Sequence, residues 1–167
     1  MKIIYIFLAF FAINCLGQST GPNPDDLYLN FVKAYDVLSA EKLANLYIKD
    51  AEALNLYDHS PSNSMKGRPS IEKYYERFFQ AIKDENQKLR LTFKVVDRQK
   101  VGDLILDNGF YQLEVLPSAG SGQSSYGKFS TVLMVEDGVW KFKTDATTNT
   151  ELVEYEGAVG EMIPKGE

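Results

Sequence analysis

The sequence contains one histidine, His59, which directly follows Asp58. An imidazole titrates near neutral pH, so an adjacent aspartate and histidine can act together as a general base. The same stretch, Asp58-His59-Ser60-Pro61, is also typical of a solvated turn, because Asp, Ser and Pro favour turns. We favour the turn, and the pair remains a candidate for proton transfer.

A second candidate site is a group of aromatic side chains that could surround an apolar ligand. Its members are Tyr75, Phe78, Tyr126 and Trp140. An ordinary aromatic core is the alternative, and we favour it for these rings. Gln112 and Glu114 share one face of a predicted strand, so they either line such a cavity or point outward from it.

Other kinds of site lack their sequence signatures. The chain has one histidine, one cysteine and no paired carboxylates at ligand spacing, so we expect no metal and no cofactor. Gly120-Ser121-Gly122-Gln123 lacks the lysine and the helix of a phosphate-binding loop. The net charge of −5 and the scattered basic residues argue against binding to nucleic acid.

The clearest structural signal is Asp137-Gly138, which separates two runs of alternating residues. It predicts a β-hairpin, because both positions of its two-residue turn need positive φ. The apolar face of this hairpin should pack inward, and simple alternation sends Asp145 to the opposite face unless a bulge intervenes. The predicted pairs are Glu136 with Val139, Val135 with Trp140, Leu133 with Phe142 and Thr131 with Thr144.

The rest of the chain predicts helices first and strands later. Helical spacing of apolar residues predicts helices over 24–38, 40–47 and 67–82. Strands are expected over 51–57, 88–96 and 104–116, the last with a bulge at Asn108-Gly109, while 58–66 reads as a loop and 97–101 as a connection. The acidic, glycine-containing end of the chain predicts a mobile tail over 154–167.

The N-terminus has the layout of a secretory signal peptide over residues 1–17, with one lysine, an apolar run and a small residue at Gly17. A linker over 18–23 and a single domain over 24–153 would follow. We expect export to the periplasm or the extracellular space, with no transmembrane helix after cleavage. The alternative is a lipid anchor on Cys15, although Asn14 stands where lipoproteins carry a small residue.

The order of these elements and several short motifs resemble the SnoaL-like, or nuclear-transport-factor-two-like, superfamily. The motifs span residues 24–150 and are Leu43-Ala44-Asn45-Leu46-Tyr47 with Asp50-Ala51, Lys66-Gly67-Arg68-Pro69-Ser70-Ile71, Gly127-Lys128-Phe129 and Asp137-Gly138-Val139-Trp140-Lys141-Phe142. The resemblance implies an α+β cone, in which a curved antiparallel sheet wraps around a long helix and leaves a pocket at its open end. The superfamily includes isomerases, dehydratases, polyketide cyclases, epoxide hydrolases and non-catalytic members, so the fold alone does not settle function.

Ketosteroid isomerase, one member type, uses a carboxylate base with a tyrosine and a protonated acid as donors. Carried over by resemblance, the base falls at Asn55, the tyrosine at Phe31 and the second acid at Thr131. None of these residues supplies the required group, so steroid-type isomerisation is not expected. Tyr35, one helical turn after Phe31, could supply a phenol instead.

These observations leave three hypotheses for function. The first is an exported domain that binds a small apolar or amphipathic molecule and forms a homodimer through its sheet. The second is a lyase or isomerase that uses Asp58, His59 and Tyr35 as catalytic residues, and the third is a non-catalytic dimerisation module. The residues expected to line the pocket are Phe31, Asn55, Tyr75, Phe78, Gln112, Glu114, Tyr126, Thr131 and Trp140.

Overall fold

The computed structural model describes residues 21–58 and 61–164. In chain order the elements are α1 (Asp25–Asp36), α2 (Ala40–Ala44), β1 (Tyr47–Asn55), β2 (Asn63–Lys66), α3 (Arg68–Asp84), β3 (Lys88–Val101), β4 (Leu104–Leu116), β5 (Gln123–Glu136), β6 (Val139–Thr150), α4 (Leu152–Gly157) and β7 (Glu161–Ile163). Across these two described ranges, the strands form one seven-stranded sheet in the order β2-β1-β6-β5-β4-β3-β7. The predicted signal peptide and Cys15 lie outside the described residues.

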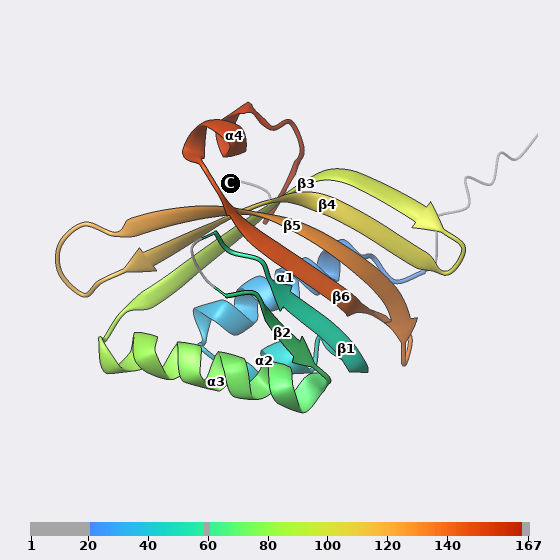
Figure 1. Cartoon of the computed structure of the whole chain (residues 1–167), viewed down its shortest axis with the longest axis horizontal. Helices are drawn as coiled ribbons and strands as arrows, with labels where there is room; N and C mark the ends of the chain where they lie inside the picture. The colour runs from blue at the N-terminus through green and yellow to red at the C-terminus, as the bar shows by residue number, and fades with distance from the viewer. Residues whose placement is uncertain (1–20, 59–60, 165–167) are drawn as a thin grey trace, which may run out of the picture.

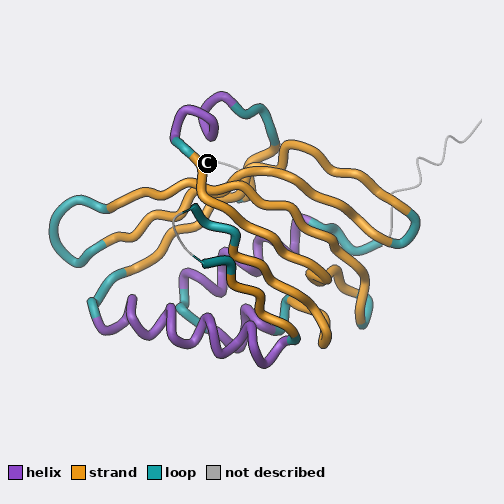
Figure 2. The backbone as a smooth tube through the Cα atoms, in the orientation of Figure 1, coloured by secondary structure: helices purple, strands orange, loops and turns teal. Residues whose placement is uncertain are grey.

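The sheet is curved and unclosed, and helices lie on both of its sides. Helices α1, α2 and α3 lie together on one side, and the short α4 lies on the other (Figure 1). Figure 2 shows the same arrangement, with the long strands crossing above the three helices. The predicted α+β architecture is therefore confirmed. Within residues 21–58 and 61–164, no helix combines the length and the apolar character needed to cross a membrane.

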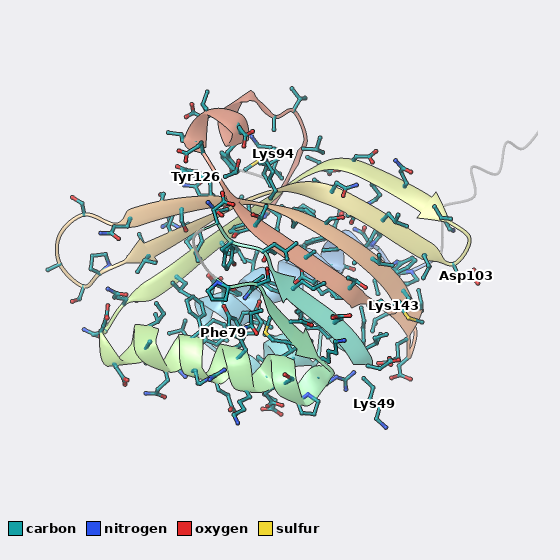
Figure 3. All side chains as sticks on the ribbon, in the orientation of Figure 1. Lys49, Phe79, Lys94, Asp103, Tyr126 and Lys143 are labelled. Atoms are coloured by element: carbon teal, nitrogen blue, oxygen red, sulfur yellow. The ribbon has the colours of Figure 1, made fainter. Side chains whose placement is uncertain are left out.

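Helices α1 and α3 pack on the sheet through apolar stripes. In α3 the buried residues Ile71, Tyr75, Phe79 and Ile82 recur every three or four positions, as one face of a helix requires. Phe79 projects from α3 toward the sheet (Figure 3). The helix begins directly after Gly67, whose φ of 76° favours glycine, and the Gly67 N–H donates to the Ala51 carbonyl at 2.8 Å.

The β5–β6 hairpin has the predicted turn, but its register shifts along the strands. Val135 lies opposite Trp140 and Leu133 opposite Phe142, as expected. Lys143 is then an extra residue in β6, so Thr131 pairs with Asp145 and Val132 pairs with Thr144. The predicted pair of Thr131 with Thr144 is therefore wrong, and the bulge turns Asp145 inward.

The far end of this hairpin does not belong to the inward apolar face. Val135 is 41% exposed, and Trp140 is only partly buried. The Trp140 indole Nε1–H donates to the Pro22 carbonyl at 2.8 Å, which ties the hairpin to the segment before α1. The inward apolar face of the hairpin therefore ends at Leu133 and Phe142, both of which are almost fully buried.

Several predicted boundaries differ because strand pairing overrides local periodicity. The second helix ends at Ala44, so that Tyr47 begins β1, and part of the predicted loop over 58–66 forms β2. Strand β3 continues through the predicted connection to Val101. The expected bulge is present, but its extra residue is Val96 of β3, opposite Asn108-Gly109 of β4.

The C-terminal segment is structured where a mobile tail was expected. Strand β7 pairs with Phe93–Val95 of β3, and Tyr155 of α4 packs against Phe110 of β4 and Tyr126 of β5. The Lys94 Nζ donates to the carbonyls of Tyr155 at 2.6 Å and Ala158 at 3.2 Å, and it lies 4.1 Å from the centre of the Tyr155 ring. Figure 3 shows Lys94 and Tyr126 next to α4. These contacts join residues far apart in the sequence, so local patterns did not reveal them.

Candidate functional site

A cavity of about 340 Å³ lies between the concave face of the sheet and helices α1 and α3. Aromatic residues supply most of its wall: Tyr28, Phe31, Tyr35, Tyr57, Tyr74, Tyr75, Phe78, Phe93, Tyr111, Tyr126, Phe129 and Phe142. The polar residues in the wall are Asn55, Ser125, Thr131, Asp145, Thr147 and Asn149. A space of this size and composition is typical of a small-molecule site.

Six of the nine predicted pocket residues line this cavity, namely Phe31, Asn55, Tyr75, Phe78, Tyr126 and Thr131. Tyr35, predicted as a catalytic phenol, also lines it. Tyr126 differs from the others, because its ring lies against Tyr155 of α4, with centroids 4.9 Å apart and the ring planes tilted by 40°.

The other three predicted pocket residues lie elsewhere. Glu114 forms an ion pair with Arg90 at 3.2 Å, and Gln112 donates to the Ser124 hydroxyl at 3.3 Å. Their alternation with Tyr111 and Leu113 along β4 places them on the opposite face of the strand. Trp140 lines a separate hollow beside the start of α1. These three residues therefore lie outside the wall of this cavity.

Asp58, the described member of the predicted acid-base pair, does not line the cavity. Asp58 is exposed and is not among the residues of the cavity wall. Its backbone N–H donates to Asn149 Oδ1 at 2.7 Å, and Asn149 Nδ2 donates to its carboxylate at 3.4 Å. His59 lies outside the described residues. Asp58 thus connects the segment after β1 to the end of β6 through hydrogen bonds with Asn149.

The carboxyl group of the described cavity wall is Asp145, which simple alternation had assigned to the outer face unless a bulge intervened. Its side chain is almost fully buried, and its Oδ2 accepts a hydrogen bond from the Tyr47 hydroxyl at 2.5 Å. Burial raises the pKa of Asp145 to about 6, and the hydrogen bond from Tyr47 opposes this shift. A carboxyl group with this pKa can change its protonation state close to neutral pH.

Across the cavity, none of the described wall residues that face Asp145 has a basic side chain. Among the described residues of the wall, Asp145 is the one with a charged side chain. Burial raises the pKa of Tyr35 and Tyr75, and neighbouring tyrosines and the charge of Asp145 add to the effect. These phenols therefore stay protonated at neutral pH. Within the described ranges, His, Cys, Asp and Glu side chains form no group of three that could hold a metal ion.

A largely buried ion pair lies beside the cavity wall, where Asp107 of β4 is the cross-strand partner of Thr131. Asp107 is fully buried and accepts from Arg98 Nε at 2.8 Å, from Arg98 Nη2 at 3.0 Å and from the Tyr28 hydroxyl at 2.9 Å. The Tyr28 hydroxyl also lies 2.9 Å from Thr131 Oγ1. Burial lowers the pKa of the Arg98 guanidinium, but its hydrogen bonds to Asp107 and Asp25 outweigh this and raise it. Arg98 therefore stays charged.

The ring of Tyr111 lies close to the backbone of β5 at Gly127. A Cβ added to Gly127 would lie 2.2 Å from the ring of Tyr111, its direct partner on β4. Only a residue without a side chain lets this ring lie against the strand. Gly127 therefore sets how far Tyr111 extends into the cavity.

Comparison with solved structures places this geometry in a known fold. Neither protein-family models nor curated proteins match the chain. Aln2 from a Streptomyces species superposes with a TM-score of 0.66 at 14% identity, covering 81% of this chain and 98% of that one. An NTF2-like protein with a cystatin-like fold from Novosphingobium aromaticivorans gives 0.64 at 14% identity, covering 77% and 80%. The protein has the nuclear-transport-factor-two-like fold.

A third similar structure is that of a ketosteroid isomerase-like protein from Erwinia carotovora atroseptica. It gives a TM-score of 0.56 at 10% identity, covering 77% of this chain and 94% of that one. The sequence resemblance to ketosteroid isomerase placed its three functional groups at Phe31, Asn55 and Thr131. In the present protein these residues line the cavity, and none is ionisable. The carboxylate in the described wall is instead Asp145, the cross-strand partner of Thr131.

Proposed function

We propose that this protein binds a small, largely apolar molecule in the cavity between the sheet and helices α1 and α3. The observation that carries the proposal is a cavity of about 340 Å³ with an aromatic wall and one buried carboxylate, Asp145. A carboxylate buried without a cation opposes folding, because its charged form is poorly solvated. Such groups are concentrated at functional sites, and a ligand would give this one a role.

Binding can be tested with the neutral fluorophore N-phenyl-1-naphthylamine. Ala53 lies in the cavity wall and is 3% exposed, so Ala53→Leu should fill part of the space. We expect saturable binding to the natural protein and a loss of about tenfold or more in the variant. Ala119→Leu, in the exposed loop between β4 and β5, is the matched control. Equal affinity of the Ala53 variant would show that the probe binds elsewhere and would contradict the proposal.

A second candidate function is proton transfer by Asp145. Its pKa of about 6 suits a general base that works near neutral pH, and protonated tyrosines in the same wall could stabilise a developing oxyanion. This proposal predicts that the protein speeds deuterium exchange at the α-carbon of 2-tetralone in heavy water, as followed by proton NMR. Asp145→Asn should abolish the acceleration. Equal rates in both proteins would exclude Asp145 as the base.

Export and self-association remain parts of the proposal. The pattern of residues 1–17 supports export, and N-terminal sequencing of the secreted protein would test cleavage after Gly17. Partly exposed apolar residues on the outer sheet face, Val96, Val132 and Met134, support a homodimer through the sheet. Light scattering that shows only monomer at high micromolar concentration would contradict the dimer.

A further inference from the structure

We propose that the ligand of this cavity carries a protonated amine on an apolar body, and that its N–H groups bind Asp145 and Thr131. The inference rests on the proposed binding function and names the chemical class of the ligand. It depends on the charge of the wall, the direction of its hydrogen bonds and the nature of the surrounding rings.

The charge of the wall is one-sided. Asp145 is the charged residue among the described members of the wall, and the protein hydrogen bond that its carboxylate accepts comes from Tyr47. Tyr47 is not itself in the wall, so this hydrogen bond does not come from the cavity side. A carboxylate has room for about four hydrogen bonds, so Asp145 can accept more from the cavity side. A ligand with a positive charge would supply both the donor and the missing countercharge.

The hydrogen-bond direction at Thr131 follows from the buried ion pair. Tyr28 has one hydroxyl proton and donates it to Asp107, which the charged Arg98 binds through two N–H groups. The short contact between Tyr28 and Thr131 must therefore be donated by Thr131. With its proton used, Thr131 Oγ1 can act only as an acceptor toward the cavity.

These two acceptors lie close enough to bind one ammonium group. Asp145 and Thr131 are direct partners across β5 and β6, and both line the cavity. The Cβ atoms of such pairs lie about 4.5 to 5.5 Å apart. An ammonium group with several N–H donors fits between them, whereas an alcohol has one donor and leaves the charge of Asp145 uncompensated.

The aromatic wall also favours a cation. Phe31 stacks on Tyr35 with centroids 5.3 Å apart and meets Tyr75 edge-on at 6.3 Å. The faces of Phe and Tyr rings attract cations most strongly when water is excluded. The net charge of −5 would in addition raise the local concentration of cationic ligands around the protein.

Three probes with one ring system separate charge from shape. These are the amine 2-(1-naphthyl)ethylamine, the alcohol 2-(1-naphthyl)ethanol and the carboxylate anion 1-naphthaleneacetate. Each is titrated calorimetrically into the full-length protein at pH 8, where Asp145 is ionised. We expect the amine to bind about tenfold or more tightly than the alcohol, and the anion to bind most weakly. Asp145→Asn should remove the preference for the amine and leave the alcohol unchanged. Asp103→Asn, in the exposed turn between β3 and β4, should keep the preference.

The outcomes distinguish a failure of the amine inference from a failure of the proposed binding function. Equal affinity for amine and alcohol would overturn the amine inference and leave cavity binding intact. An amine preference that survives Asp145→Asn would also overturn it. If none of the three probes binds while N-phenyl-1-naphthylamine does, the amine inference fails alone. If that fluorophore also fails to bind, the proposed function fails with it.

Discussion

Asp145 and Thr131 face each other across β5 and β6, and both side chains line the cavity. The pairing exists because Lys143 adds one residue to β6 and reverses the alternation beyond it. A buried carboxylate thus lies beside a threonine that is connected through Tyr28 to the ion pair of Asp107 and Arg98. Substitutions of Asp145 and of the Asp107–Arg98 ion pair should therefore change stability and ligand binding in different ways.

Replacing Asp145 by Asn should stabilise the protein above pH 6. The pKa of Asp145 is about 6 in the folded protein against 3.8 for an unperturbed aspartate, so the folded state binds the proton more tightly. Stability is therefore highest below the unfolded pKa and falls as pH rises through the folded pKa, by about 3 kcal/mol in total. The variant should lose most of this pH dependence in urea denaturation at pH 4.5 and pH 8. A variant less stable than the natural protein at pH 8 would contradict the prediction.

Removing the Tyr47 hydroxyl should raise the pKa of Asp145 further. The hydrogen bond from Tyr47 favours the ionised carboxylate and opposes the effect of burial. Tyr47→Phe should therefore move the titration of Asp145 above pH 6, as measured by carbon-13 NMR of the side-chain carboxyl. Tyr74→Phe is the matched control, because Tyr74 lines the cavity without contributing to the shift. A lower pKa in the Tyr47 variant would mean that the hydrogen bond does not stabilise the charge.

Breaking the buried ion pair should cost far more than breaking an exposed one. Arg98→Met leaves the fully buried Asp107 without its cation, and we expect a loss of about 3 to 5 kcal/mol. Arg90→Met removes an ion pair to Glu114 in which the Arg90 side chain is 63% exposed, so the loss should stay below about 1 kcal/mol. Urea denaturation measures both, and similar losses would show that Asp107 does not depend on Arg98.

A methyl group at position 127 should disturb the cavity wall. In Gly127→Ala the new Cβ would lie 2.2 Å from the Tyr111 ring, which must move. We expect destabilisation of about 1 to 3 kcal/mol and weaker binding of N-phenyl-1-naphthylamine. Gly157→Ala is the control, because a Cβ at that position meets nothing within 4 Å. Thermal unfolding and fluorescence titration would test both, and unchanged binding in the Gly127 variant would argue against a role for Tyr111 in the wall.

The fold could be predicted where sequence patterns are local. The helical spacing of Ile71, Tyr75 and Ile82, and the Asp137-Gly138 turn, each report their structure within a few residues. The resemblance that these elements produced led to the correct architecture, and six of the nine residues predicted to line the pocket lie in the cavity wall. Short β7 was missed, because its pairing with Phe93–Val95 joins residues nearly seventy positions apart.

The chemistry of the site could not be predicted in the same way. Asp145 enters the cavity through the bulge at Lys143, and nothing in the flanking sequence marks an extra residue there. Strict alternation along β6 would place Asp145 on the outer face of the sheet. Asp58 and His59 were therefore the candidates for proton transfer. Trp140 was assigned to the pocket from its aromatic type, but its indole is held by the Pro22 carbonyl.

The short strand β7 has a practical consequence for producing this protein. A chain shortened to Thr150 would lose the partner of Phe93–Val95 and the two carbonyl acceptors of Lys94. A bare sheet edge readily pairs with another chain, so such a fragment should self-associate. A purification tag should therefore follow the C-terminal strand rather than replace it.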